Sequence, residues 1–232
     1  MIEMLNCDCM DYMAGLPDKA FELAIVDPPY GIQKGNLTGF KKKTIQHEQS
    51  EKCAEWDTRP DSSYFKELFR VSKNQIIWGM QYFVDDLPDF SQPIIWDKKT
   101  GDNYFADAEL AYCSIPGTAR MFTHQWCGAF KDSERGEKSV HVNQKPVALY
   151  KWLLSRYAKP GDRILDTHGG SGSICIACHD LGFDLTWMEK DADYYEAACK
   201  RYKNHAAQAS LFDPVELTKE TSAPELFEGW RE

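Results

Sequence analysis

The stretch RILDTHGGSGSICIACHDLGF (residues 163–183) has the pattern of a strand, a glycine turn and a helix. Its apolar start is short enough for a buried strand that ends at Asp166. Three glycines follow at once: Gly169, Gly170 and Gly172. Glycines let the backbone approach a ligand closely, and the first turn of the next helix presents unpaired N–H groups. The stretch therefore predicts an α/β fold with a ligand site at the carboxyl edge of a parallel sheet.

The next segment, DLTWMEKD (184–191), predicts a second strand that ends in Glu189. A carboxylate at that place can accept hydrogen bonds from ribose hydroxyls, which indicates a nucleoside ligand. A dinucleotide fingerprint would have a third glycine where this chain has Cys175, and Asp166 would repel a pyrophosphate. S-adenosylmethionine carries an ammonium and a sulfonium group, so we expect this cofactor rather than NAD.

Alternating patterns along the chain predict the fold class. Short apolar runs predict strands at residues 23–26, 75–79, 93–97, 109–114, 163–166 and 184–189. Helix patterns lie between several of them, at residues 61–71, 145–158 and 191–205. We expect a doubly wound, mostly parallel sheet in a single catalytic domain over residues 1–205. We interpret residues 31–60 and 115–144 as inserted recognition segments, and residues 206–232 as an acidic C-terminal extension.

Composition limits the class of protein further. The chain has 232 residues and is 43% hydrophobic, enough for one substantial core. No run approaches the roughly 18 apolar residues that span a bilayer, and the start MIEMLNCDCM lacks a signal-peptide layout. We therefore expect a cytoplasmic protein. Cys175, Cys178 and His179 could bind a metal, but no second pair matches their spacing, so we interpret the cysteines as core residues and expect no metal.

The charge is unevenly distributed along the chain. The net charge of -9 taken alone argues against a nucleic-acid partner. However, the acids gather in the tail after Gln208, whereas KGNLTGFKKK (34–43) has no acid. We expect its four lysines to contact phosphates: Lys34, Lys41, Lys42 and Lys43. The alternative is that this segment is a solvated loop.

The stretch AIVDPPYGIQKG (24–35) runs from a buried strand into the motif Asp27, Pro28, Pro29, Tyr30. Asp and Pro are ordinary turn formers, so the motif by itself could simply end a strand. At the carboxyl edge of a sheet, however, it places a carboxylate, a stretch of backbone with φ fixed near -65° and an aromatic ring. Together with the distant glycine loop it indicates a site for a flat polar group.

Three motifs in this order resemble those of the DNA amino-methyltransferases, in particular their beta class. They are DPPY at 27–30, HVNQKP at 141–146 and DTHGGSGS at 166–173. The resemblance covers residues 1–205. It implies a Rossmann-like fold of the kind found in S-adenosylmethionine-dependent methyltransferases, with a circularly permuted motif order.

The resemblance also implies roles for individual residues. The cofactor-binding set that it implies is Asp8, Cys9, Lys145, Asp166, His168, Gly170, Ser171, Gly172 and Glu189. The implied catalytic motif is DPPY, in which Asp27 and a carbonyl at Pro28 accept the amino N–H bonds and Tyr30 stacks on the base. The family loop more commonly has Pro and Phe where this chain has Thr167 and His168. His168 is therefore interpreted either as packing over the sulfonium or as hydrogen-bonding in the core.

The resemblance implies a DNA adenine-N6 methyltransferase of the small kind found in restriction–modification systems and phages, in the cytoplasm of a prokaryotic or phage-infected cell. Asp27 favours adenine because N4-cytosine enzymes more often have Ser there, and enzymes acting on protein glutamine usually have Asn. The expected partner is double-stranded DNA, with Arg120 among the contacts, and no membrane. A homodimer is compatible with the resemblance. Cytosine-N4 or RNA methylation and a non-catalytic DNA-binding module remain alternatives.

Overall fold

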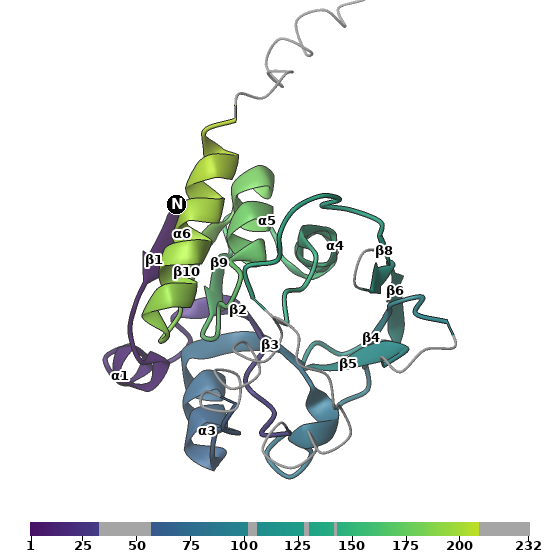
Figure 1. The fold of residues 1–232 in the computed structure, drawn as a ribbon. Coiled ribbons are helices and arrows are strands. Elements are labelled where there is room, and N and C mark those ends of the chain that lie inside the picture. Colours follow the sequence, from purple (N-terminus) through teal and green to yellow (C-terminus); the bar gives the residue numbers. More distant parts are fainter. Residues whose placement is uncertain (33–56, 102–105, 128–129, 142, 209–232) are drawn as a thin grey trace, which may run out of the picture.

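The computed structural model describes residues 1–32, 57–101, 106–127, 130–141 and 143–208. Its centre is an eight-stranded sheet with the strand order β1-β10-β9-β2-β3-β5-β4-β6 (Figure 1). The strands of this sheet are β1 Ile2–Leu5, β2 Phe21–Val26, β3 Ser72–Trp78, β4 Ile94–Asp97, β5 Ala108–Cys113, β6 Arg120–Thr123, β9 Arg163–Asp166 and β10 Asp184–Met188. The helices are α1 Cys9–Ala14, α3 Ser62–Val71, α4 Val147–Tyr157, α5 Ser173–Leu181 and α6 Ala192–Ala206, with a 3-10 turn at η2 Met80–Tyr82. A separate small sheet pairs β7 Trp126–Cys127 with β8 Phe130–Lys131.

Helices cover both faces of the large sheet. One face carries α4, α5 and α6, whose residues Leu153, Cys175 and Ala198 are buried in one apolar cluster. The other face carries α1 and α3, whose residues Met13 and Leu68 are buried in a second cluster (Figure 1). Burial on both faces explains why the central strands read as nearly continuous apolar runs. The predicted fold class, a doubly wound and mostly parallel sheet, is confirmed.

Local sequence signals fix where the helices begin. The Asp61 side chain accepts the backbone N–H of Ser63 at 2.8 Å and caps α3. Asp191 caps α6 in the same way, and α4 begins directly after Pro146. The two aspartates satisfy unpaired N–H groups of a first turn, and Pro146 presets the backbone at the start of α4. The predicted helices at 61–71, 145–158 and 191–205 form within a few residues of their expected bounds.

The order of the strands creates a crevice between β9 and β2. These two strands are parallel neighbours, although about 140 residues separate them along the chain. From β9 the chain continues through α5 to β10 on one side, whereas from β2 it continues through α3 to β3 on the other side and the other face. Ligands of open α/β sheets bind at such a switch point, outside the carboxyl ends of the strands.

The structure also differs from the sequence-based expectations. All six predicted strands form, but β1 and β6 were missed because they are the edge strands of the sheet, and their partly exposed sequences IEML and RMFT are not continuous apolar runs. Residues 115–144 are not simply a loop, since β6 extends the large sheet beside β4 and β7 and β8 pair with each other. In addition, β5 runs antiparallel to both of its neighbours.

Two further expectations concern the cysteines and the membrane. Cys175 and Cys178 are buried in the core, as predicted. Within the described ranges, no cluster of three or more His, Cys, Asp or Glu side chains has a geometry that could hold a metal ion. In the same part of the chain, none of the helices combines the length and the apolar character needed to cross a bilayer.

Candidate active site

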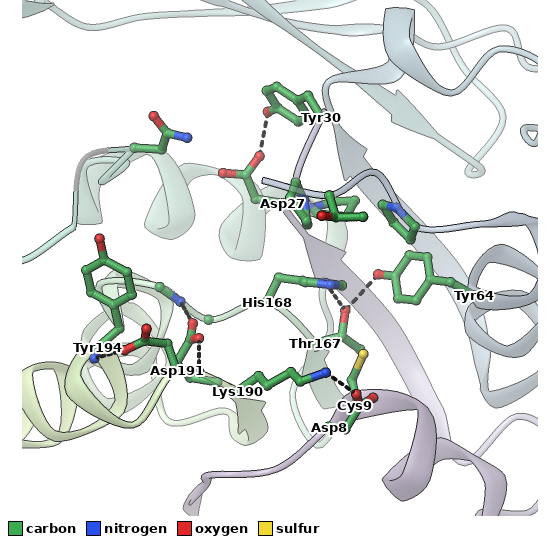
Figure 2. A pocket seen from close by; sticks show the side chains of 18 of the residues that line it. Asp8, Cys9, Asp27, Tyr30, Tyr64, Thr167, His168, Lys190, Asp191 and Tyr194 are labelled. Carbon is green, nitrogen blue, oxygen red and sulfur yellow. Dashed lines mark hydrogen bonds and ion pairs between the residues drawn. The ribbon is translucent and has the colours of Figure 1, made fainter. Parts of the chain in front are cut away.

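A pocket of about 670 Å³ lies at the carboxyl ends of β1, β10, β9 and β2 (Figure 2). An acidic residue stands at or shortly after the end of each of these four strands: Asp166 ends β9, Glu189 and Asp27 directly follow β10 and β2, and Asp8 comes three residues after β1. Two motifs far apart in the sequence thus meet, because DPPY follows β2 and the glycine loop follows β9. The pocket is the crevice that the switch point predicts.

Both oxygens of the Asp27 carboxylate have defined partners. The Tyr30 hydroxyl donates to Oδ1 at 2.5 Å, and the Lys145 ammonium forms an ion pair with Oδ2. Burial and the nearby Asp27 charge raise the pKa of Tyr30 well above its usual value, so its hydroxyl stays protonated and acts as the donor. Asp27 is therefore held in one orientation at the pocket wall.

The Tyr30 ring is packed tightly against the sheet. It stacks on Tyr82 with 4.9 Å between ring centroids and meets the edge of Phe83 at 6.0 Å. Gly79 has φ +74°, and a Cβ built there would lie 2.2 Å from the Tyr30 ring. A glycine at this position lets the ring lie directly on the backbone.

The glycine loop after β9 packs equally closely against the neighbouring strand β10. The backbone N–H of Gly169 donates to the Met188 carbonyl at 2.8 Å, and a Cβ on Gly169 would lie 1.8 Å from Nε1 of Trp187. The N–H of Gly170 donates to Oε2 of Glu189 at 2.8 Å, while Oε1 of Glu189 accepts the N–H of Asp191 at 2.8 Å. Glu189 therefore holds the loop and the start of α6 together at the pocket edge.

Asp8 forms the opposite wall of the pocket, beyond β1. Its carboxylate caps α1 by accepting the N–H of Met10 at 2.9 Å and pairs with Nζ of Lys190 at 2.7 Å (Figure 2). The hydrogen bond from Lys190 lowers the pKa of Asp8 below its usual value. This wall thus presents an ionised carboxylate to the pocket.

His168 lines the pocket, and its imidazole is hydrogen-bonded to a neighbouring side chain. Its Nδ1 lies 3.0 Å from the Thr167 hydroxyl, which is 2.7 Å from the Tyr64 hydroxyl. The imidazole meets the Tyr64 ring edge-on with 5.1 Å between centroids. Burial lowers the pKa of His168 to about 4, so the ring is neutral at neutral pH and does not repel a cationic ligand.

Asp166 supports the loop from below instead of lining the pocket. Its side chain is buried, and Oδ1 accepts the backbone N–H of His168 at 3.1 Å. Burial, together with the charges of Asp27 and Glu189, raises the pKa of Asp166 to about 8. The carboxyl group is therefore mostly protonated at neutral pH.

Replacing Asp166 by Asn is expected to stabilise the protein at alkaline pH. Between the ordinary pKa of 3.8 and the folded value of about 8, the folded state keeps a proton that the unfolded chain loses. The free energy of unfolding therefore decreases as pH rises through this window, by roughly 2 to 4 kcal/mol at pH 8. Asn removes that dependence and retains an oxygen acceptor for His168. Urea unfolding at pH 5 and pH 8, with Asp18→Asn as an exposed control, measures the difference.

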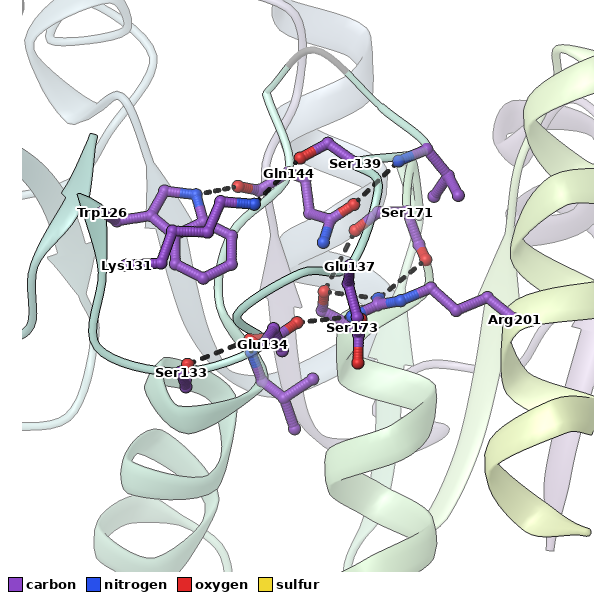
Figure 3. Close-up of polar contacts among 12 residues, drawn as sticks. Trp126, Lys131, Ser133, Glu134, Glu137, Ser139, Gln144, Ser171, Ser173 and Arg201 are labelled. Carbon is purple, nitrogen blue, oxygen red and sulfur yellow. Dashed lines mark hydrogen bonds and ion pairs between the residues drawn. The ribbon is translucent and has the colours of Figure 1, made fainter. Parts of the chain in front are cut away.

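Polar contacts join the segment between β7 and α4 to the glycine loop (Figure 3). Glu134 accepts Nη2 of Arg201 at 2.5 Å and the backbone N–H of Val147 at 3.1 Å. The same Arg201 donates to the Ser171 carbonyl at 3.2 Å and to the Ser173 hydroxyl at 2.9 Å. Through Glu134 and Arg201, the predicted recognition segment 115–144 is thus hydrogen-bonded to α4, α6 and the glycine loop.

The structure brings most of the predicted site residues together. Those that line the pocket are Asp8, Cys9, Asp27, Pro28, Pro29, Tyr30, Lys145, His168, Gly170, Ser171 and Glu189. Asp166 and Gly172 lie behind the loop, where Gly172 caps α5 with φ +68°. Arg120 is exposed on the edge strand β6 and is not part of the pocket. Lys34, Lys41, Lys42 and Lys43 lie outside the described residues.

Sequence reasoning missed several residues of the pocket lining: Tyr64, His141, Asn143, Lys190, Asp191 and Tyr194. Lys190 and Asp191 follow Glu189 directly. Extending the predicted site by two residues beyond the end of this strand would have included them. Tyr64 comes from α3 on the far side of the sheet, and no local signal indicates that its hydroxyl reaches Thr167.

Fold and pocket together define the class: a Rossmann-like fold of the S-adenosylmethionine-dependent methyltransferase type. A family model described as DNA methylase matches residues 38–200, which is more than half of the chain. The chain belongs to this DNA methylase family, which covers both adenine-N6 and cytosine-N4 enzymes. The type II methyltransferase M.HinfI of Haemophilus influenzae is 26% identical over 248 residues, covering 86% of this chain and 68% of that protein.

Solved structures of related fold cover nearly the whole molecule. The M1.HpyAVI-SAM complex has a TM-score of 0.54 at 20% identity and covers 87% of this chain and 98% of its own. The cytosine-N4-specific PvuII DNA methyltransferase has a TM-score of 0.57 at 13% identity and covers 94% of this chain and 90% of its own. At these identities the likeness establishes the fold.

Proposed function

We propose that this protein transfers a methyl group from S-adenosylmethionine to the N6 amino group of adenine in double-stranded DNA. The observation that carries the proposal is the meeting of Asp27, oriented by Tyr30 and Lys145, with the glycine loop in one pocket. The proposed chemistry needs an acceptor for amino N–H bonds beside a nucleoside-cofactor site, and this pocket holds both.

The chemistry of the pocket lining suits a cationic nucleoside cofactor. Five carboxylates line it: Asp8, Asp27, Asp61, Glu189 and Asp191. Among the described residues, the Lys and Arg side chains of the lining are each paired with an acid: Arg59 with Asp86, Lys145 with Asp27 and Lys190 with Asp8. When bound, S-adenosylmethionine supplies an electrophilic methyl group. The glycine loop, Glu189 and the Asp8 wall would hold it.

Glu189→Gln is expected to weaken cofactor binding by about 10-fold or more. A glutamine side chain has one oxygen, so either Gly170 or Asp191 loses the acceptor that now fixes its N–H group. Isothermal titration calorimetry with S-adenosylmethionine measures the change. An unchanged dissociation constant would remove Glu189 from the cofactor site.

The DPPY motif is arranged to activate a weak nucleophile. The lone pair of an aromatic amino group is delocalised into the ring, so the group reacts poorly by itself. An amino group whose N–H bonds are accepted by Asp27 and by a carbonyl at Pro28 has its lone pair directed away from both. The two prolines fix the direction of the backbone here, and positioning of this kind supplies most of the acceleration.

Adenine is favoured as the acceptor by Asp27, which stands where N4-cytosine enzymes more often have Ser. The shared fold does not discriminate, because the PvuII enzyme of similar fold is cytosine-N4-specific. A base inside a duplex is out of reach of this pocket, so the target would be flipped out at a cost of a few kcal/mol. Lys34, Lys41, Lys42, Lys43 and Arg120 remain predicted phosphate or base contacts, and a homodimer remains compatible with the proposal.

The decisive experiment is methyl transfer from labelled S-adenosylmethionine to unmethylated genomic DNA, followed by nucleoside analysis and sequencing of the modified positions. N6-methyladenine in a defined context is the expected result. N4-methylcytosine would overturn the choice of base, and methylation of RNA but not of duplex DNA would overturn the substrate. Cofactor binding without transfer to any of these acceptors would favour a non-catalytic DNA-binding module.

A further inference from the structure

A chain of alternating charges leads from Asp27 away from the pocket. Nζ of Lys145 pairs with Asp27 on one side and lies 3.3 Å from Oε2 of Glu109 on the other. Glu109 is paired in turn with Nζ of Lys98 at 2.9 Å. The chain therefore joins the end of β2 to β5 and to the residue that follows β4, across the carboxyl edge of the sheet.

This chain of charges is largely shielded from solvent. The Lys145 side chain is only 4% exposed, and its ammonium lies 5.5 Å from the centroid of the buried Trp78 ring. A buried ammonium without partners would be very costly, so the two carboxylates fix its position. Burial alone would lower the pKa of Lys145, but Asp27 and Glu109 outweigh it and the pKa is raised. Lys145 therefore stays charged.

Glu109 is also kept in its charged form. Burial alone would raise its pKa, but the charges of Lys145 and Lys98 outweigh burial and lower it. Glu109 does not line the pocket, whereas Lys145 and Asp27 do. Glu109 thus reaches the pocket by contact through its ion pair with Lys145.

We propose that Glu109 is a positioning residue for methyl transfer, which orients the Asp27 carboxylate by holding the ammonium of Lys145 from behind. This inference rests on the proposed function of the same pocket. It assigns the Lys145 ammonium to the part of the pocket around Asp27, where the methyl-accepting nucleobase would bind. The resemblance had implied that Lys145 contacts the cofactor. The Tyr30 hydroxyl fixes Oδ1 of Asp27, and the pair of Lys145 and Glu109 fixes Oδ2.

The test compares Glu109→Gln and Lys145→Met with the wild type in steady-state methyl transfer. Misplacing a reacting group by about 1 Å can cost about 100-fold in rate. We expect kcat to fall about 100-fold in Lys145→Met and about 10-fold in Glu109→Gln. The calorimetric dissociation constant for S-adenosylmethionine should stay within about 2-fold of wild type in both variants. Neither change is in the glycine loop, Glu189 or the Asp8 wall, which would hold the cofactor.

The pH profile separates positioning from a merely structural role. Among the described residues, the titratable groups whose charges interact with Asp27 include Tyr30, Tyr64 of α3, Lys145, Tyr150 of α4 and Asp166 of β9, while Glu109 of β5 lies behind Lys145. Of these, only the Lys145 ammonium is a cation. Its loss leaves the partly buried Asp27 carboxylate without its countercharge, so the activity of Lys145→Met should fall at acidic pH and recover as pH rises. A purely structural defect would lower activity equally across the pH range.

A matched control removes an ion-paired lysine within α4, the helix that begins two residues after Lys145. Lys151 in α4 pairs with Asp180 at 2.6 Å on the outer surface, so Lys151→Met should keep both kcat and the pH profile. If Glu109→Gln does not fold, Glu109→Asp keeps the charge on a side chain one methylene shorter, and a smaller loss in kcat is then expected. Wild-type kcat in a folded Glu109 variant overturns the proposal, as does a weakened cofactor affinity with unchanged kcat in Lys145→Met.

Failure of this inference can be told from failure of the proposed function. The variants are compared with the wild type on whichever nucleic acid the wild type methylates, so a cytosine or RNA acceptor leaves the comparison intact. A wild-type protein that methylates none of them overturns both.

Discussion

The Asp27→Asn variant is expected to bind S-adenosylmethionine normally and to transfer methyl groups about 1,000-fold more slowly than the wild type. Asn has nearly the same shape as Asp, but its amide carries hydrogens where the carboxylate accepts bonds from Tyr30 and Lys145. The side chain would lose its charge and one acceptor oxygen, so an amino group would no longer be held by both N–H bonds. Single-turnover transfer to DNA and calorimetry with the cofactor measure the two effects separately.

An exposed aspartate provides the control for this variant. Asp18 is 77% exposed and pairs with Arg70 far from the pocket, so Asp18→Asn should transfer methyl groups at the wild-type rate. Near wild-type turnover in Asp27→Asn would contradict the catalytic role of the DPPY motif, whatever the fold. Thermal unfolding should accompany both assays, because the change also removes one of the two carboxylates that hold Lys145.

The second large effect is expected for Gly169→Ala. A Cβ at this position would lie 1.8 Å from Nε1 of the fully buried Trp187, and neither the strand nor the ring can move far. The loop must shift, which is expected to cost about 3 kcal/mol in the free energy of unfolding. A shift of about 1 Å in the loop should also reduce methyl transfer about 100-fold. Urea unfolding and cofactor titration test the two effects.

Gly15 offers a matched control for this change. It ends α1 with φ -84°, and a Cβ there would meet only the Tyr12 carbonyl at an ordinary 3.7 Å. Gly15→Ala should therefore leave stability and activity within a few tenths of a kcal/mol of wild type. If Gly169→Ala matched Gly15→Ala in both measurements, the close approach of the loop to Trp187 would have no functional consequence.

Much of the fold was predictable because its signals are local. The strand predicted at 163–166 coincides with β9, and α3 and α6 begin after the Asp61 and Asp191 caps. Buried parallel strands are short apolar runs, and caps act within one turn, so both can be recognised in a few neighbouring residues. The pairing of DPPY with the glycine loop was also predictable, because the carboxyl ends of parallel strands meet at one edge.

Other parts of the site depend on contacts between distant segments. Glu109 is the clearest case: in an all-parallel sheet the first residues of its strand would lie at the edge opposite the pocket. Because β5 is antiparallel to β3 and β4, its start lies instead at the carboxyl edge, next to Lys145. No pattern within residues 108–113 reveals that direction.

The amino-acid sequence by itself determined which chemical groups end the strands: Asp8, Asp27, Asp166 and Glu189 each follow or complete a short apolar run. Only the tertiary structure decided how they are used. It exposes Asp8, Asp27 and Glu189 to the pocket and buries Asp166 beneath the loop. The reason is that residue type and strand ends are encoded locally, whereas strand order, strand direction and burial arise from pairings between separate segments, some of them more than 100 residues apart.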